Sequence, residues 1–188
     1  MLWILSPVPV ADVHRLMFDS IITLPEFNAC RNKLNYIVQQ LKPTASDIVN
    51  ISNITIEQRS DPLWFQYRKM RLTASNFGIV LKAIERNRYT ETLFRQLMGQ
   101  YSIASLAAIQ WGIDHESTAV ADYEMKQQCK VKSVGLFLSD CGLLGSSPDG
   151  FVSDDCILEV KCPWYLRSNT TTIFEAALHK PDFYLNVI

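Results

Sequence analysis

The chain has 188 residues, of which 48% are hydrophobic, 11% aromatic and 20% charged. These proportions exclude a disordered, collagen-like or disulfide-scaffold protein, and they predict one domain or two small ones with enough apolar material for a core. The formal net charge is −1. A nucleic-acid partner would therefore have to be held by a local basic surface or by metal ions.

No window of the sequence approaches the roughly 18 apolar residues of a membrane-spanning helix, so we expect no membrane association. The opening segment MLWILSPVPV lacks the basic flank of a secretion signal. The five cysteines are an odd number and include no Cys-x-x-Cys pair. This favours reduced cysteines in an intracellular compartment, cytoplasmic or nuclear, over a zinc finger or a disulfide framework.

Residues 1–57 are predicted to form a helical N-terminal extension. Apolar residues recur at helical spacing between Asp12 and Leu41. Residues 42–46 form the predicted connector, and residues 48–56 alternate weakly between apolar and polar. No residue of this segment carries evident chemistry.

Four helices are predicted between residues 60 and 128. Ser60-Asp61-Pro62 offers a cap residue followed by proline, which favours a helix from Pro62 to about Arg71. Thr73-Ala74-Ser75 offers a second cap, for a helix that ends near Glu85. The other two helices are predicted at residues 90–100 and 103–128.

After Lys130 the hydrophobic pattern changes from helical to alternating. This change predicts strands at residues 131–138, 143–146, 151–152 and 156–162, followed by a helix at residues 171–178. Helices followed by a short mixed sheet and a further helix indicate an α/β or α+β core.

The stretch GSSPDGFVSDDCILEVKCP, residues 145–163, is the most informative part of the chain. Side chains alternate along a strand, so one face is predicted to hold Ile157, Glu159 and Lys161. The other face is wholly apolar and is predicted to be core: Leu158, Val160 and Cys162. An acid and a base therefore stand two residues apart on one face.

Asp149 precedes Glu159 by ten residues, with a Ser153-Asp154-Asp155 turn near the midpoint. A hairpin folded at this turn brings the two carboxylates within reach of one metal ion. Pro148 and Gly150 are predicted to set the turn that aims Asp149.

A third carboxylate, Glu116, lies in the centre of an apolar stripe on the long predicted helix. A carboxylate in such a stripe needs a cationic partner, either a magnesium ion held by Asp149 and Glu159 or Lys161 itself. Together these residues would form an oxygen-ligand site for a hard cation. Simpler alternatives remain open: an exposed Glu-x-Lys salt bridge, a plain Ser-Pro-Asp-Gly turn and a solvated Glu116.

These ordered motifs resemble a known family. Ser147-Pro148-Asp149-Gly150 followed by Glu159-Val160-Lys161-Cys162-Pro163 is similar to the PD-(D/E)XK restriction-endonuclease-like nucleases. More narrowly, Trp111-Gly112…Glu116 and Trp64…Arg68…Arg71-Leu72-Thr73-Ala74-Ser75 resemble the YqaJ-like viral recombinase branch, which includes the lambda-type exonucleases. The resemblance places a nuclease domain at residues 58–188.

The resemblance implies a restriction-endonuclease-like core and a Mg²⁺-dependent deoxyribonuclease that acts on double-stranded DNA ends in recombination or repair. Asp149, Glu159 and the main-chain carbonyl of Val160 would bind metal, and Glu116 would help to hold a second ion. Lys161 would orient or deprotonate the attacking water. Two Mg²⁺ ions are implied, for which Mn²⁺ can substitute.

The resemblance also implies a pocket for the terminal 5′-phosphate, formed by Arg68, Ser75 and Ser147, because a guanidinium and two hydroxyls can satisfy phosphate oxygens. The simpler alternatives are a solvated helix arginine for Arg68 and a helix N-cap for Ser75. Six basic residues would line the DNA or belong to ordinary solvated faces: Arg68, Lys69, Arg71, Lys82, Arg86 and Arg88.

The end of the chain departs from the family pattern. Family members continue after the equivalent of Tyr184 with a helix bearing Gln-x-Gln, whereas here Asn186 and Ile188 fall at those positions. We therefore expect a C-terminally incomplete domain that is marginally stable and weakly active by itself. The alternative function is a non-catalytic DNA-end-binding or assembly module derived from a mobile element or virus. The sequence does not distinguish exonuclease from endonuclease action. It also does not determine strand polarity or homo-oligomer formation.

Overall fold

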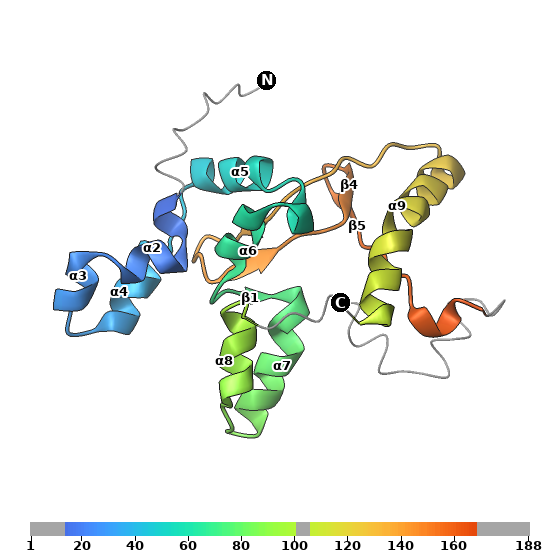
Figure 1. Ribbon diagram of the computed structural model, residues 1–188. Coiled ribbons are helices and arrows are strands. Elements are labelled where there is room, and N and C mark those ends of the chain that lie inside the picture. The colour runs from blue at the N-terminus through green and yellow to red at the C-terminus, as the bar shows by residue number, and fades with distance from the viewer. Residues whose placement is uncertain (1–13, 101–105, 169–188) are drawn as a thin grey trace. The chain divides into compact units, whose positions relative to one another are not determined.

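The structure, a computed structural model, describes residues 14–100 and 106–168. The chain divides into two compact units, which we call unit 1 and unit 2. Figure 1 labels the helices and strands of both. Unit 1 comprises residues 1–101 and 133–148, and unit 2 comprises residues 102–132 and 149–188. The helix predicted at residues 171–178 lies outside the described residues.

Unit 1 begins with short helices, in agreement with the predicted helical extension. They are η1 (His14–Leu16), α2 (Phe18–Ile22), α3 (Pro25–Ala29), α4 (Lys33–Gln40), α5 (Ala45–Ile54) and η2 (Gln58–Ser60). The weak alternation in residues 48–56 does not produce a strand, because most of that segment belongs to α5. A capping box between Thr44 and Asp47 starts this helix, and Asp47 also pairs with Arg15.

Three further helices of unit 1 follow the predicted order. Helix α6 (Pro62–Arg68) starts at the predicted proline, with the Asp61 carboxylate accepting a hydrogen bond from Leu63 N at 2.8 Å. It ends three residues earlier than predicted, shortly before Met70, which adopts a φ of 56°. Helix α7 (Ala74–Glu85) and helix α8 (Glu91–Leu97) lie side by side (Figure 1).

The N-cap of α7 is Thr73, not Ser75. Thr73 and Asn76 form a capping box in which Thr73 N donates to the Asn76 side chain at 2.8 Å. Ser75 lies inside the first turn of the helix and is exposed. The cap alternative for Ser75 is therefore wrong, and its hydroxyl serves other partners.

A three-stranded mixed sheet joins distant parts of unit 1. Strand β3 (Leu144–Ser146) lies between β1 (Leu72–Thr73) and β2 (Phe137–Leu138). β1 is parallel to β3, with Thr73 opposite Gly145, and β2 is antiparallel to β3. The strands are shorter than the predicted ranges, but the pairing places the start of α7 alongside the segment that leads to Ser147.

One hydrophobic core holds unit 1 together. Its buried members are Leu16, Met17, Ile51, Trp64, Tyr67, Leu136 and Leu138. Residues before and after position 57 thus share one core. The domain boundary proposed at residue 57 stays a prediction.

Arg71 is fully buried and therefore cannot line DNA, contrary to the expectation for this residue. Its guanidinium donates hydrogen bonds to the carbonyl oxygens of Gly142 at 2.7 Å, Tyr67 at 2.5 Å and Leu16 at 2.7 Å. Burial lowers the pKa of Arg71 to about 10. Gly142 has a φ of 72°, and a Cβ there would lie 1.8 Å from the carbonyl oxygen of Leu41, so this position requires glycine.

In the part of unit 2 that the structure describes, the main elements are a long helix and a hairpin. Its elements are α9 (Ala107–Gln127), β4 (Gly150–Ser153), β5 (Cys156–Leu158) and η3 (Trp164–Leu166). β4 and β5 are antiparallel, with Gly150 opposite Leu158 and Phe151 opposite Ile157. Across residues 14–100 and 106–168, no helix has both the length and the apolar character needed to cross a membrane.

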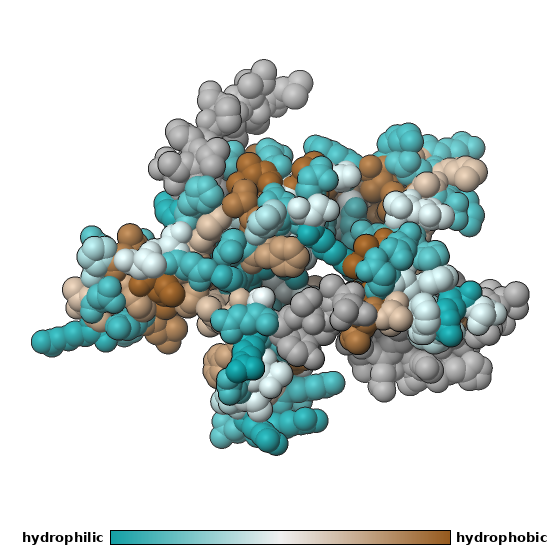
Figure 2. All heavy atoms as spheres, in the orientation of Figure 1, coloured by the Kyte–Doolittle hydropathy of each residue, from teal (hydrophilic) through white to brown (hydrophobic). Residues whose placement is uncertain are grey.

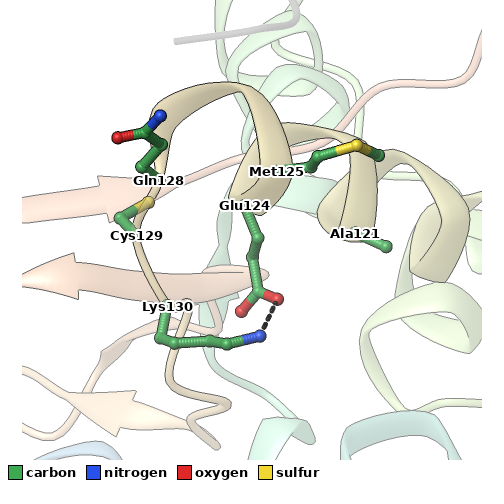
Figure 3. Close-up of a pocket in the computed structure, with 6 residues that line it drawn as sticks. All are labelled: Ala121, Glu124, Met125, Gln128, Cys129 and Lys130. Carbon is green, nitrogen blue, oxygen red and sulfur yellow. Dashed lines mark hydrogen bonds and ion pairs between the residues drawn. The ribbon is translucent and has the colours of Figure 1, made fainter.

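The exit from α9 is fixed by Glu124 (Figure 3). Its carboxylate accepts hydrogen bonds from Lys130 Nζ at 2.8 Å and from Val131 N at 2.7 Å. The hydrogen bond from Lys130 is the main cause that lowers the pKa of Glu124. The chain then continues to Lys132, which bridges to Phe151 of β4. Glu124 and Lys130 also line a surface pocket, and their hydrogen bond serves to fix the end of α9.

Candidate active site

The predicted hairpin is present and places Asp149 beside the segment that carries Glu159. Asp149 N donates to the carbonyl oxygen of Leu158 at 3.0 Å. The Asp149 carboxylate accepts a hydrogen bond from Val160 N at 2.5 Å. Because Gly150 lies opposite Leu158, the register continues to Asp149 opposite Glu159. The turn between the strands falls at residues 154–155, as predicted.

The chain bends at Asp149, between Pro148 and Gly150, as predicted. Gly150 is the first residue of β4, and a Cβ there would lie 2.2 Å from Val131 Cγ1. The close approach of Val131 to the hairpin therefore also favours glycine at this position. Pro148 is buried, and its carbonyl oxygen accepts a hydrogen bond from Gln58 Nε2 at 2.9 Å, which fixes the segment before Asp149.

Strand β5 ends at Leu158, earlier than the predicted residue 162. The reason is that Val160 N–H bonds to the Asp149 carboxylate and not to a neighbouring strand. Exposure nevertheless continues to alternate, with Glu159 and Lys161 exposed and Cys162 half-buried. The apolar face is therefore only partly covered within the described residues.

Glu159 and Lys161 form an ion pair with each other. Their side chains are 43% and 36% exposed, respectively. An ion pair this exposed contributes little to stability, because solvent screens it and the two side chains lose conformational freedom. Both groups are accessible from solvent, as a site that binds an anionic substrate requires.

Glu116 of α9 lies in the same neighbourhood as Asp149. Burial raises the pKa of the Cys162 thiol, and the negative charges of Glu116 and Asp149 raise it further. Both acids must therefore lie within electrostatic range of one half-buried thiol. Among residues 14–100 and 106–168, however, no three acidic, histidine or cysteine side chains form a group that could hold a metal ion. The metal-ligand roles of Asp149, Glu159, Glu116 and Val160 stay predictions.

Unit 1 brings the three predicted phosphate-binding residues into one cluster, which we call the Arg68 cluster: Arg68, Ser75, Ser147, Trp64 and Thr73. Arg68 Nη2 donates to Ser75 Oγ at 2.7 Å and lies 3.4 Å from Thr73 Oγ1. The two hydroxyls are 3.0 Å apart. The guanidinium carbon lies 3.9 Å from the ring centroid of Trp64, whose Nε1 donates to Ser147 Oγ at 2.9 Å.

The electrostatics of the Arg68 cluster suit an anion. Burial is the main cause that lowers the pKa of Arg68 to about 10, and Arg59 adds to it, so the guanidinium keeps its charge at neutral pH. Among the described residues, its hydrogen-bond acceptors are the hydroxyls of Thr73 and Ser75, which carry no negative charge. The phosphate-binding role stays a prediction, and the geometry adds Trp64 and Thr73 to the residues around it.

The sequence contained signals for these two additional residues. Trp64 precedes Arg68 by four positions, which places both on one face of a helix. Thr73 directly precedes α7, so its hydroxyl is near the helix start that also carries Ser75. The bond from Trp64 to Ser147 spans 83 positions and could not be inferred from spacing.

The family model of the YqaJ-like viral recombinase domain matches residues 63–185. The chain belongs to this YqaJ-like family. The expected family is thereby confirmed, and the described helices and small sheets agree with the expected α/β class. No curated protein matches the sequence.

Among solved structures, the YqaJ-like chain is similar to LHK-Exo, an alkaline exonuclease from Laribacter hongkongensis. A crystal structure of LHK-Exo in complex with dAMP has 32% sequence identity and a TM-score of 0.51, and the match covers 68% of this chain. A second LHK-Exo structure has 27% identity and a TM-score of 0.44, with 67% of this chain and 64% of that chain covered. The YqaJ-like chain spans 65% of the LHK-Exo chain in the first comparison.

The other basic residues expected near DNA have different surroundings. Lys69 pairs with Asp19 at 2.5 Å. Lys82, Arg86 and Arg88 are exposed at the end of α7 and just beyond it. The visible face of α7 and α8 is largely hydrophilic (Figure 2). These three side chains remain available for phosphate contacts.

Proposed function

We propose that this chain is a metal-dependent deoxyribonuclease that degrades duplex DNA from 5′-phosphorylated ends, in recombination or repair. The observation that carries the proposal is the hairpin, in which Asp149 lies opposite Glu159 and Glu159 pairs with Lys161. Membership of the YqaJ-like family and similarity to an alkaline exonuclease support this assignment.

The donor chemistry at the hairpin fits a hard divalent cation. Carboxylates of Asp149, Glu159 and Glu116, with the carbonyl oxygen of Val160, are the oxygen ligands that Mg²⁺ prefers, and Mn²⁺ accepts the same set. Glu159 already faces a positive group, the Lys161 ammonium. A bound Mg²⁺ would polarise the phosphate and lower the pKa of a water nucleophile.

In this proposal the residues of the hairpin have separate roles. Asp149 and Glu159 would hold the divalent cation beside the reacting phosphate, and Asp149 keeps its position through the hydrogen bond from Val160 N. Lys161 turns its ammonium from Glu159 to the scissile phosphate, where it positions the attacking water and offsets the developing negative charge.

The Arg68 cluster would bind the terminal 5′-phosphate. A terminal phosphate carries close to two negative charges and three terminal oxygens, whereas an interior phosphodiester carries one charge and two such oxygens. The guanidinium of Arg68 and the hydroxyls of Ser75 and Ser147 match the first better than the second. The cluster therefore supports a preference for DNA ends with a 5′-phosphate.

The nuclease proposal is tested by incubating the protein with 5′-phosphorylated linear duplex and with circular duplex, each in Mg²⁺ or in EDTA. We expect mononucleotide release from the linear duplex in Mg²⁺, with the circular duplex intact and EDTA inhibitory. Degradation of both duplexes at equal rates would contradict exonuclease action. Cleavage that persists in EDTA would contradict metal dependence.

A second function is a non-catalytic module that binds DNA ends. One observation favours it: Arg68 and Ser75 are hydrogen-bonded to each other, and Trp64 connects Arg68 to Ser147, so this cluster is formed without a metal ion. Such a module would bind 5′-phosphorylated ends in Mg²⁺ without releasing nucleotides. The same incubation, followed by a gel-shift of the linear duplex, separates the two functions.

A further inference from the structure

Unit 2 carries a row of stacked aromatic and cationic side chains that the proposed function does not use. We call it the aromatic ladder: His115, Trp111, Trp164 and Arg167. The rings of Trp111 and His115 stack with centroids 3.6 Å apart and an interplanar angle of 24°. Trp111 meets Trp164 edge to face at 5.7 Å. The Arg167 guanidinium lies 4.0 Å from the Trp164 ring centroid.

Local hydrogen bonds hold both ends of the ladder. His115 Nδ1 lies 2.9 Å from the carbonyl oxygen of Trp111, one helical turn away. Arg167 Nη1 donates to the carbonyl oxygen of Trp164 at 2.9 Å. The side chains are thus fixed before any ligand arrives, which reduces the entropy lost on binding.

The ladder is exposed at its Trp164 end. Trp164 is 36% exposed and Arg167 is exposed, whereas Trp111 and His115 are half-buried. Large aromatic side chains of a described core, such as Trp64 at 8%, are covered far more completely. Packing of η3 against α9 therefore accounts for the partial burial of Trp111 and His115, but not for the exposed arrangement of Trp164 and Arg167.

The ladder is continuous with the candidate catalytic residues. His115 directly precedes Glu116 on α9. Trp164 follows Lys161 by three positions, and its ring meets Trp111 on the helix that carries Glu116. A ligand on Trp164 would therefore lie close to the acids of the hairpin and of α9.

We propose that the aromatic ladder binds a nucleobase of the DNA strand at the hydrolytic site. An exposed indole with a neighbouring guanidinium offers π-stacking and cation–π contacts, which every base accepts whatever its sequence. The inference deepens the proposed function and rests on DNA being the substrate. The base belongs either to the strand before cleavage or to the released mononucleotide.

The test compares ligands that differ only in their bases, with hydrolysis blocked by EDTA. The full chain is titrated with a short single-stranded oligonucleotide, with an abasic oligonucleotide of the same length and with dAMP. We expect the wild type to bind the base-bearing oligonucleotide about 5- to 150-fold more tightly than the abasic one. If dAMP also binds tightly, the base bound by the ladder is that of the released mononucleotide. If dAMP binds weakly, the base is that of the strand before cleavage.

Variants separate stacking from a structural role. Trp164→Ala should lose the preference for base-bearing ligand while binding the abasic one as before, and Trp164→Phe should keep most of the preference. Phe94→Ala, a change at a 48% exposed aromatic residue of α8, serves as the matched control and should bind like the wild type. Thermal unfolding of each variant reports whether it folds.

Equal binding of base-bearing and abasic oligonucleotides by the wild type would overturn the inference, and this result needs no variant. A Trp164→Ala protein that loses both ligands equally would also overturn it, because the ladder would then only support the fold. Nuclease activity without a preference for base-bearing ligand would refute base binding by the aromatic ladder and leave the proposed function intact. A preference for base-bearing ligand without nuclease activity would refute the proposed function and leave base binding by the ladder standing.

Discussion

The Arg68 cluster and the carboxylate hairpin differ in how their functional side chains are held. In the cluster, Arg68 has a ring on one side and hydroxyl partners on another, and Ser147 is held by Trp64. In the hairpin, Glu159 and Lys161 are exposed and bond only to each other among the contacts described. The geometry of the first region is set by packing, whereas the second would have to break its ion pair to act as we propose.

This difference predicts that the two regions fail in different ways. Under the proposed function, changes in the hairpin should remove the chemical step, because its charges would act on the reacting phosphate. Changes in the Arg68 cluster should alter which ends are accepted, because its contacts would be to a phosphate that does not react.

Asp149→Asn is expected to reduce cleavage to background. Asparagine keeps the shape and can still accept the hydrogen bond from Val160 N, but it lacks the charge that a hard cation requires. The measurement is nucleotide release in Mg²⁺, together with metal binding by calorimetry. Asp154→Asn, on the turn of the same hairpin, is the matched control. Normal cleavage by Asp149→Asn would contradict the assignment.

Lys161→Ala is expected to slow cleavage about 10²- to 10³-fold while metal affinity stays near the wild-type value. Lysine contributes no ligand to the metal, and its removal leaves Glu159 without its ammonium partner. Single-turnover rates at saturating Mg²⁺ measure the effect. Lys130→Ala, which breaks the exposed pair with Glu124, is the control. A near-normal rate for Lys161→Ala would exclude a catalytic lysine.

Trp64→Phe is expected to raise KM for 5′-phosphorylated ends about 2- to 10-fold, with kcat unchanged. Phenylalanine keeps a ring beneath Arg68 but cannot donate to Ser147, and a lost hydrogen bond of this kind costs about 0.5–1.5 kcal/mol. Steady-state kinetics on 5′-phosphorylated and 5′-hydroxyl duplex measure the effect. An equal change on both substrates would indicate that Trp64 serves only the core.

Cys141 is expected to react with iodoacetamide faster than Cys162 at pH 8. The hydrogen bond with Ser139 is the main cause that lowers the pKa of the exposed Cys141 thiol, whereas burial and two nearby acids raise that of Cys162. Only the thiolate reacts, so the lower pKa gives the faster rate. Mass spectrometry of peptides over time measures both. Faster labelling of Cys162 would place it outside the field of Glu116 and Asp149.

The hairpin could be predicted from the sequence because its information is local. Ten positions separate Asp149 from Glu159, and the turn residues lie between them. Its early end could not be predicted, because it depends on Val160 N–H bonding to the Asp149 side chain. The hydrophobic periodicity of a sequence reflects the burial of side chains and does not reveal such a competing hydrogen bond.

Family resemblance identified Arg68, Ser75 and Ser147, but the sequence alone could not predict that they lie in one cluster. Its parts meet because β1 pairs in parallel with β3, and short two- and three-residue strands give little periodic signal. The burial of Arg71 was missed for a similar reason. Three carbonyl oxygens from separate segments receive its hydrogen bonds, and main-chain acceptors are the same at every position of a sequence.

The central claim is that the Arg68 cluster selects ends and the hairpin cleaves them. Its most direct test is the ratio of kcat/KM on 5′-phosphorylated duplex to kcat/KM on 5′-hydroxyl duplex, measured for the wild type, Arg68→Ala and Arg95→Ala. Arg95, an exposed arginine of α8 that pairs with Glu91, is the control. We predict a ratio of about 10 to 150 for the wild type and for Arg95→Ala, since hydrogen bonds to a charged group are worth about 1.5–3 kcal/mol, and a ratio near one for Arg68→Ala. A ratio in Arg68→Ala equal to that of the wild type would contradict the account.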